Sequence, residues 1–191
     1  MKKDVLNSVD VKDIWDYFCK KYNVTLVKKE NSKLMSIVGW AFSRLGIMSK
    51  EKFIEDFYTS LLVGKKRLVY LPKGAVIGEG DTDELCSQLC TLVHELHHLV
   101  VQKLGVTYLF SKYKVIKAET DAYLCNLELY HYFTNSILSA EYMAGLLASY
   151  NCGTEEMSFA LKKYSAANKM IRRGHYKQPI VLELIEHVES L

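Results

Sequence analysis

The chain has 191 residues, of which 49% are hydrophobic and 25% are charged, and its formal net charge is only +3. A chain of this size and composition can bury a proper core, and we expect a single domain over residues 1–191. The weak, scattered positive charge argues against a nucleic-acid partner. No apolar run approaches the roughly 20 residues of a membrane span, which argues against a membrane partner.

The N-terminus and the cysteines predict a cytoplasmic protein. Residues 1–10 contain no apolar segment of the kind that a secretory signal needs. The five cysteines are odd in number, and three of them lie in apolar stretches with a helical pattern. This distribution fits buried free thiols better than a disulfide framework, and free thiols are typical of a reducing, intracellular compartment.

The first part of the chain alternates between helical and β-prone segments. Apolar residues recur there at helical spacing, and one run rich in β-formers interrupts them. In chain order these patterns predict a helix at 10–22, a strand at 23–28, and helices at 34–45 and 50–56. Gly46 is expected to end the helix before it.

A hairpin and a long helix are predicted next. Two β-prone runs, 57–63 and 67–72, flank a short Gly-containing turn and predict the hairpin. Pro72 indicates that the second strand ends there or lies at a sheet edge. After a glycine-rich connection, a helix is expected from about Asp83 to Leu104, with Gly105 ending it.

The remainder of the chain is predicted to be helical. Helices are expected near 116–133, 136–150, 154–172 and 179–190. The aromatic-rich segment 106–114 before them is ambiguous between strand and loop. The order of elements predicts an α+β fold, in which residues 1–105 form a mixed α/β part with a small mixed sheet and residues 106–191 form a helical part.

The most informative motif lies in the long helix. Residues 94–98 match the pattern HExxH, with His94, Glu95 and His98 in its fixed positions. Four residues apart on a helix, both imidazoles can reach one metal ion, and the carboxylate of Glu95 can meet a water bound to that metal. These groups, with an open coordination position, are what zinc-assisted hydrolysis requires. The alternative reading is an amphipathic helix with two incidental histidines beside its apolar stripe.

A zinc site usually needs at least a third protein ligand. The extended pattern HExxHxxGxxH is absent, because Val101 and Leu104 occupy its glycine and third-histidine positions. The next predicted helix supplies Glu119, with the small Ala122 on the same face, so that this helix can pack close under the metal. Asp121 points to another face of that helix and is the alternative third ligand.

With Glu119 placed after HExxH, the sequence resembles the gluzincin type of zinc metallopeptidase. The resemblance covers roughly residues 67–131, about a third of the chain, and includes the strand Arg67–Leu71 before the motif helix. It implies a zincin-like fold in which an edge strand packs on the motif helix and lines the cleft. It also implies a Zn²⁺ cofactor held by His94, His98 and Glu119. The chain departs from the family pattern in having no aspartate one turn after Glu119.

The resemblance also implies a mechanism of peptide-bond hydrolysis. Glu95 is expected to act as general base, taking a proton from the water and later delivering it to the leaving amine. Members of the family often recruit a downstream tyrosine or histidine to stabilise the oxyanion. Tyr123, His175 and Tyr176 are the candidates here, and the last two follow Gly174 in a predicted loop.

Two residues near the motif, His97 and Cys90, are not expected to be metal ligands. His97 falls on the side of the helix that carries Cys86 and Cys90, so we expect it to be a core residue or to support the ligands. Cys90 lies one turn before His94, and we expect a buried thiol there instead of a metal ligand.

The function expected from these residues is a zinc-dependent metallopeptidase. If Arg67–Leu71 is an exposed edge strand, its substrate is a polypeptide bound by strand addition. The main alternative is a non-catalytic zinc-binding scaffold or interaction protein with a degenerate peptidase fold. A hydrolase of other amides or of cell-wall peptides, and a helical packing domain without metal, are further alternatives. The sequence leaves the physiological substrate and the oligomeric state open.

Overall fold

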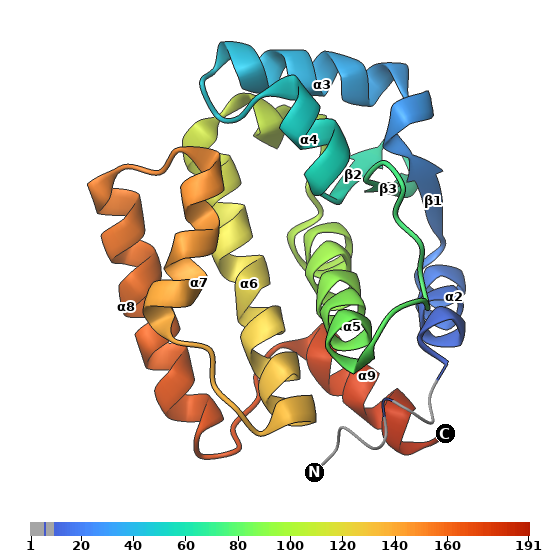
Figure 1. Cartoon of the computed structure of the whole chain (residues 1–191), viewed down its shortest axis with the longest axis vertical. Coiled ribbons are helices and arrows are strands. Elements are labelled where there is room, and N and C mark those ends of the chain that lie inside the picture. Colours follow the sequence, from blue (N-terminus) through green and yellow to red (C-terminus); the bar gives the residue numbers. More distant parts are fainter. Residues whose placement is uncertain (1–5, 7–9) are drawn as a thin grey trace.

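The computed structural model describes Leu6 and residues 10–191, and it shows an α+β fold in which helices dominate (Figure 1). The predicted α+β class is therefore confirmed. Among the described residues, no helix has both the length and the apolar character that crossing a bilayer requires. The prediction about a secretory signal concerns residues 1–10, most of which lie outside the described residues.

The first part of the chain follows the predicted order of elements. In sequence these are α2 (Val11–Tyr22), β1 (Val24–Lys28), η1 (Lys29–Asn31), α3 (Lys33–Arg44), α4 (Lys50–Asp56), β2 (Thr59–Val63) and β3 (Lys66–Leu71). The side chains of Asp10 and Ser49 accept hydrogen bonds from backbone N–H groups in the first turns of α2 and α4. Gly46 follows α3 with a φ of 65°, as expected of a glycine that ends a helix.

The sheet has the strand order β1-β3-β2, with β1 parallel and β2 antiparallel to β3. The prediction that Arg67–Leu71 is an edge strand is therefore wrong. Pro72 ends β3 but does not place it at an edge, because β1 comes from much earlier in the chain and pairs along β3. The edge strand next to the motif helix is β2. Its Leu62 N–H donates to the carbonyl of Leu104 at 2.8 Å, on the side away from β3.

The motif helix consists of two parts. Helix α5 (Thr82–Leu96) begins with a capping box, in which Asp81 and Glu84 each bond the other's backbone N–H. It continues as the π-helix η2 (His97–Gln102). The helix ends at Lys103, which has a φ of 53°, and its N–H bonds the carbonyl of His98. The prediction that Gly105 ends the helix is wrong, because a lysine already takes the left-handed conformation two residues earlier.

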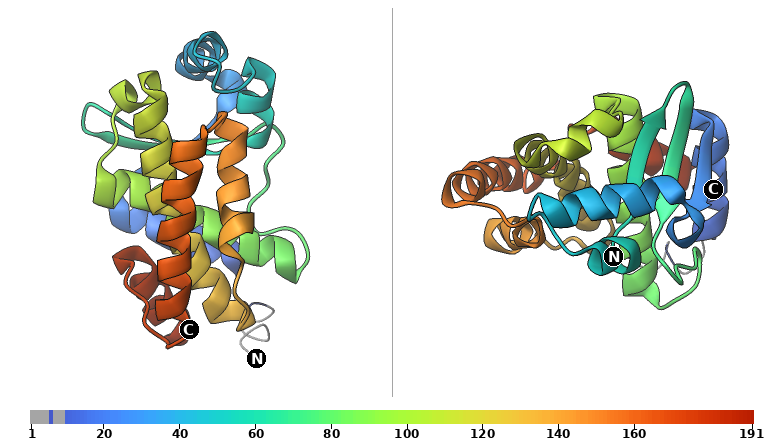
Figure 2. Two further views of the ribbon diagram at one scale, coloured as in Figure 1. Left: turned by 90° about the vertical axis from the view of Figure 1, so that its left-hand side faces the viewer. Right: turned by 90° about the horizontal axis from the view of Figure 1, so that it is seen from above.

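The second part of the chain is helical, as predicted. It comprises η3 (Val106–Phe110), α6 (Lys112–Thr134), α7 (Ala140–Leu146), η4 (Leu147–Tyr150), α8 (Thr154–Ile171) and α9 (Pro179–Glu189). The ambiguous segment 106–114 is a short 3₁₀-helix followed by the first residues of α6. Helix α8 packs against both α6 and α7, and α9 packs against α5 and α6 (Figures 1 and 2).

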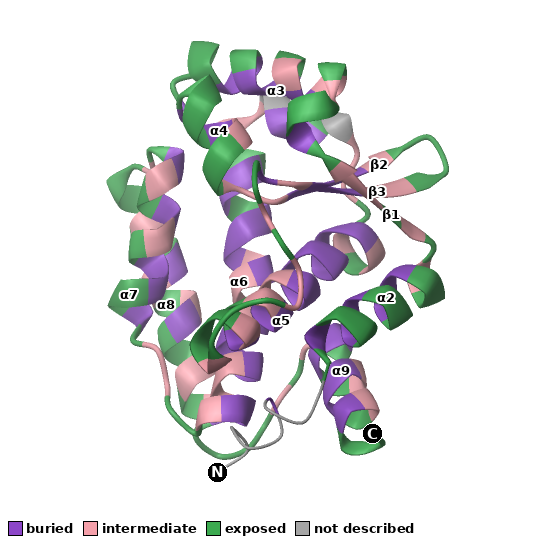
Figure 3. Cartoon of the chain, turned by 45° about the vertical axis from the view of Figure 1, so that its right-hand side comes forward, coloured by how far each residue is buried: buried purple, intermediate pink, exposed green. Residues whose placement is uncertain are grey.

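Helix α6 contributes to two hydrophobic cores formed by the described residues. Cys125 and Phe133 belong to a core that packs α2, α5 and α9 together. Val115 and Leu127 belong to a second core, which packs α3, α4, α7 and α8. The buried faces of α5 and α6 accordingly meet in the interior of the molecule (Figure 3). Since both cores hold α6, the residues on its inner face have fixed positions relative to α5.

A buried lysine joins the sheet to α4. Lys29 follows β1 directly and is only 1% exposed. Its Nζ donates to the carbonyl of Phe53 at 2.8 Å and to that of Phe57 at 2.7 Å, and it lies 3.7 Å from the centre of the Phe53 ring. Burial lowers the pKa of Lys29 to about 7, against the opposing effect of the carboxylates of Glu95 and Glu119. The amine thus holds the segment that leads from α4 into β2.

We expect Lys29 to make stability depend on pH. Its pKa is about 7 in the folded protein and 10.5 in the unfolded chain, so between these values the unfolded state binds more protons. Relative to Lys29→Met, the metal-free wild-type protein should gain stability as pH rises from 7 towards 10.5, by up to about 1.4 kcal/mol per pH unit. Urea unfolding of both proteins at several pH values measures this difference. Parallel stability curves for the two proteins would contradict it.

Candidate metal centre

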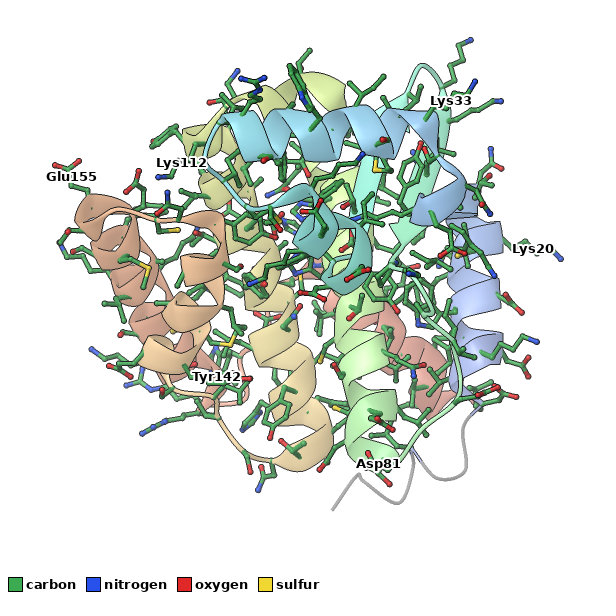
Figure 4. The ribbon with its side chains drawn as sticks, turned by 45° about the horizontal axis from the view of Figure 1, so that its top comes forward. Lys20, Lys33, Asp81, Lys112, Tyr142 and Glu155 are labelled. Carbon is green, nitrogen blue, oxygen red and sulfur yellow. The ribbon has the colours of Figure 1, made fainter. Side chains whose placement is uncertain are left out.

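The motif residues lie where α5 passes α6. The two helices pack against each other and begin at opposite ends of the molecule, as the labels of Asp81 and Lys112 show in Figure 4. His94 and Glu95 belong to the last turn of α5, and His98 belongs to η2. All three are buried, with exposed fractions of 7%, 5% and 2%. Glu119, on α6, is 7% exposed.

Two imidazoles and one carboxylate converge in this place. His94 Nε2 lies 3.0 Å from Glu119 Oε2 and 3.1 Å from His98 Nε2, and His98 Nε2 lies 3.5 Å from Glu119 Oε1. Ligand atoms at about 2.0–2.1 Å from one tetrahedral ion are themselves about 3.3 Å apart. The buried group of His94, His98 and Glu119, hereafter the triad, can therefore hold a metal ion.

The triad is electrostatically coupled. Burial alone would lower the pKa of His98, but the carboxylate of Glu119 outweighs it and raises that pKa to about 9. Burial would likewise raise the pKa of Glu119, and the two imidazoles instead lower it far below its usual value. Glu119 is thus a carboxylate, which is the form that binds a cation.

Glu95 lies beside the triad without taking part in it. Its Oε2 atom is buried and has no hydrogen-bond partner among the described residues. Ser60 Oγ and Asn126 Oδ1 line the same pocket and are also buried without a partner. Buried polar atoms usually have a hydrogen-bond partner, either protein or water, so three such atoms in one pocket indicate a place for a polar ligand or for water. The pocket has a volume of about 220 Å³ and is lined by the triad and Glu95.

Tyr123 is the predicted catalytic candidate that the structure brings to the triad. Its ring meets that of His94 edge to face, with centroids 4.8 Å apart, and it lines the pocket. Burial raises the pKa of Tyr123 well above its usual value, with Glu119 adding to the effect, so the hydroxyl stays protonated and can donate.

Three pocket tyrosines were not predicted from the sequence: Tyr58, Tyr108 and Tyr150. Tyr58 precedes β2, Tyr108 lies in η3 and Tyr150 ends η4. The aromatic richness of segment 106–114 was the available signal for Tyr108. This signal could not place Tyr108 in the pocket, because composition does not show which side chains of a segment point towards the interior.

The structure favours Glu119 over Asp121 as third ligand. Asp121 forms an ion pair with Lys163 of α8 and lies outside the triad. The expectations for the neighbours of the motif also agree with the structure. His97 is buried with its Nδ1 3.5 Å from the thiol of Cys125, and burial lowers the pKa of His97 to about 4. Cys90 is a buried thiol 3.9 Å from the carbonyl of Asn126.

The structure does not bring His175 and Tyr176 to the triad, and this part of the prediction is corrected. Both lie between α8 and α9, where His175 is exposed and the Tyr176 hydroxyl bonds His131 Nδ1 at 2.8 Å. His131 is 12 residues beyond Glu119 on α6, which separates the two by about 18 Å along the helix. The loop after α8 therefore meets the far end of α6, and Tyr176 lines a different pocket there.

Comparison with protein-family models, with curated proteins and with solved structures gave no match for this chain. The function of this chain is therefore inferred from the residues of the site itself.

The triad predicts that the protein binds one divalent transition-metal ion. At a metal concentration one hundred times Kd, binding should raise the free energy of unfolding by about 2.7 kcal/mol. His94→Ala, His98→Ala and Glu119→Ala should each lose the ion. Elemental analysis after dialysis and thermal unfolding with and without metal measure these effects. Asp121→Asn is the matched acidic control on α6, and loss of metal in that variant would count against Glu119.

Proposed function

We propose that the protein is a zinc-dependent metallopeptidase of the gluzincin type, with a zincin-like active site. The observation that carries the proposal is the buried triad with the unpartnered Glu95 carboxylate beside it in one pocket. Imidazole and carboxylate ligands suit zinc, and three protein ligands leave a fourth position open, as in catalytic zinc sites.

The residues around the triad supply the steps of hydrolysis. When bound, zinc polarises the scissile carbonyl and makes a coordinated water more acidic. Glu95 accepts the proton of that water on its unpartnered oxygen and then delivers it to the leaving amine. The protonated hydroxyl of Tyr123 donates to the carbonyl oxygen as negative charge develops on it. The buried pocket strengthens both interactions, because solvent water screens charges less there.

The substrate that fits this site is a polypeptide. β2 is the sheet edge beside the motif helix, but at its far end the Leu62 N–H, which points away from β3, already donates to the carbonyl of Leu104. Alternate residues of an antiparallel strand present their backbone groups to the same edge, so Ser60 presents its own to that edge also. Ser60 lines the pocket of the triad. A peptide backbone that bonds to the edge at Ser60 would therefore pass the triad.

A non-catalytic zinc scaffold is the competing proposal. A purely structural site needs no base, and such sites usually have four protein ligands. Burying the Glu95 oxygen without a partner lowers the stability of the fold. A role in catalysis would explain why a carboxylate is nevertheless placed there.

Glu95→Gln separates the two proposals. We expect this variant to bind zinc as the wild-type protein does, because Glu95 is not in the triad, and to lose at least about 100-fold in kcat, because the amide cannot take a proton. A peptide library or an unfolded protein serves as substrate. Zinc content should be measured on the same samples. Unchanged turnover would dismiss Glu95 as the base, and absence of turnover in the zinc-loaded wild type would favour the scaffold.

Tyr123→Phe tests the oxyanion donor. It keeps the ring beside His94 and removes only the hydroxyl, so kcat should fall by about 100-fold or more with little change in zinc affinity. Tyr176→Phe makes the same change at the far end of α6 and should leave kcat near that of the wild type. Steady-state kinetics of the two variants decide between the tyrosines. A larger loss in Tyr176→Phe would refute the assignment to Tyr123.

A further inference from the structure

The helix that carries the motif changes its geometry at the second metal-binding histidine. α5 ends at Leu96, and His97–Gln102 form a π-helix whose last carbonyl bond runs from Lys103 N to His98 O. Short π-helical turns within longer helices occur often at functional sites, because they redirect side chains without ending the helix. Here the π-helical turn begins next to His98 and ends with Gln102.

Gln102 contacts both helices of the triad. Its Oε1 lies 2.7 Å from Nδ1 of His98, and its Nε2 donates to the carbonyl of Ala118 at 3.1 Å. A carbonyl can only accept, so the amide nitrogen of Gln102 must face Ala118 and its oxygen must face His98. Nδ1 of His98 is therefore the donor of the first bond. In the neutral imidazole, which is the form that binds metal, the lone pair of Nε2 is then directed towards His94 and Glu119.

We propose that Gln102 is a positioning residue for the metal site. It fixes the Nδ1–H form of His98, so that Nε2 can bind metal, and it attaches the π-helical turn to the backbone immediately before Glu119. One side chain thus sets the orientation of the second ligand and the distance to the third. Residues that support metal ligands in this way typically change metal affinity 10- to 100-fold when they are removed. The inference rests on the metal site of the proposed function.

Two substitutions at Gln102 separate its two hydrogen bonds. Q102L removes both and should weaken zinc binding about 10- to 100-fold. Q102E keeps an acceptor for Nδ1–H of His98 but loses the donor to Ala118, so it should recover most of the affinity. Competition with a chromophoric chelator measures the zinc affinity of each variant. In the zinc-loaded proteins, ¹H–¹⁵N spectra of the imidazoles should show the Nδ1–H of His98 in the wild type and in Q102E, and its loss or exchange broadening in Q102L.

Gln88 offers a matched control in the same helix. Its Oε1 accepts from Gly78 N and its Nε2 donates to the carbonyl of Glu79, both at 2.7 Å. Q88L therefore removes an equivalent pair of bonds away from the triad, and it should lower the melting temperature without changing zinc affinity.

The outcomes distinguish this inference from the proposed function. Wild-type protein that binds no zinc overturns the proposed function. Zinc-binding wild type together with equally tight Q102L leaves that function standing and overturns the role of Gln102. A Q102E as weak as Q102L overturns the fixing of His98 as the cause.

Discussion

The packing of α5 against α6 is the constraint on which the site depends. It brings a carboxylate from one helix within 3.0 Å of an imidazole from the other, in a place where His94, His98 and Glu119 are each less than a tenth exposed. Burying such groups costs free energy unless each finds a partner, and here the partners are one another. The hydrophobic cores on both sides of α6 offset that cost, since they hold the helices together independently of the triad. A cation placed between the three groups would replace their mutual hydrogen bonds with stronger contacts.

The opposite wall of the pocket is held by a different interaction. Phe57, Tyr58 and Ser60 belong to the segment that leads from α4 into β2, and this segment lines the pocket. Lys29 fixes it through the carbonyls of Phe53 and Phe57. The amine comes from the end of β1, at the other edge of the sheet from β2. The distance between the sheet edge and the triad is therefore set by the sheet as well as by the helices.

The local elements could be predicted from the sequence because they depend on short-range patterns. The helices and the hairpin follow from hydrophobic spacing and turn residues, and His94, His98 and Glu119 follow from helical spacing and the choice of residue types. Strand order could not be predicted, because β1 and β3 are far apart in the chain. The residue pattern of either strand does not show which other strand it pairs with. The same limit explains the error at His175 and Tyr176, since the path of the chain after α8 decides which end of α6 they meet.

The arrangement of donors around the triad bears on whether a metal there is structural or catalytic. A thiol was available one turn before His94, and structural zinc sites favour thiolates and four protein ligands. Yet the Cys90 thiol lies near the carbonyl of Asn126 and outside the triad. The hydrogen bond with the neighbouring thiol of Cys86, together with burial, raises the pKa of Cys90 well above its usual value, which keeps it protonated and a poor ligand. The triad lines the same pocket as Glu95 and Tyr123. A carboxylate that can accept a proton and a hydroxyl that can donate one are of use there only if a reacting group enters, and this favours catalysis over a purely structural metal.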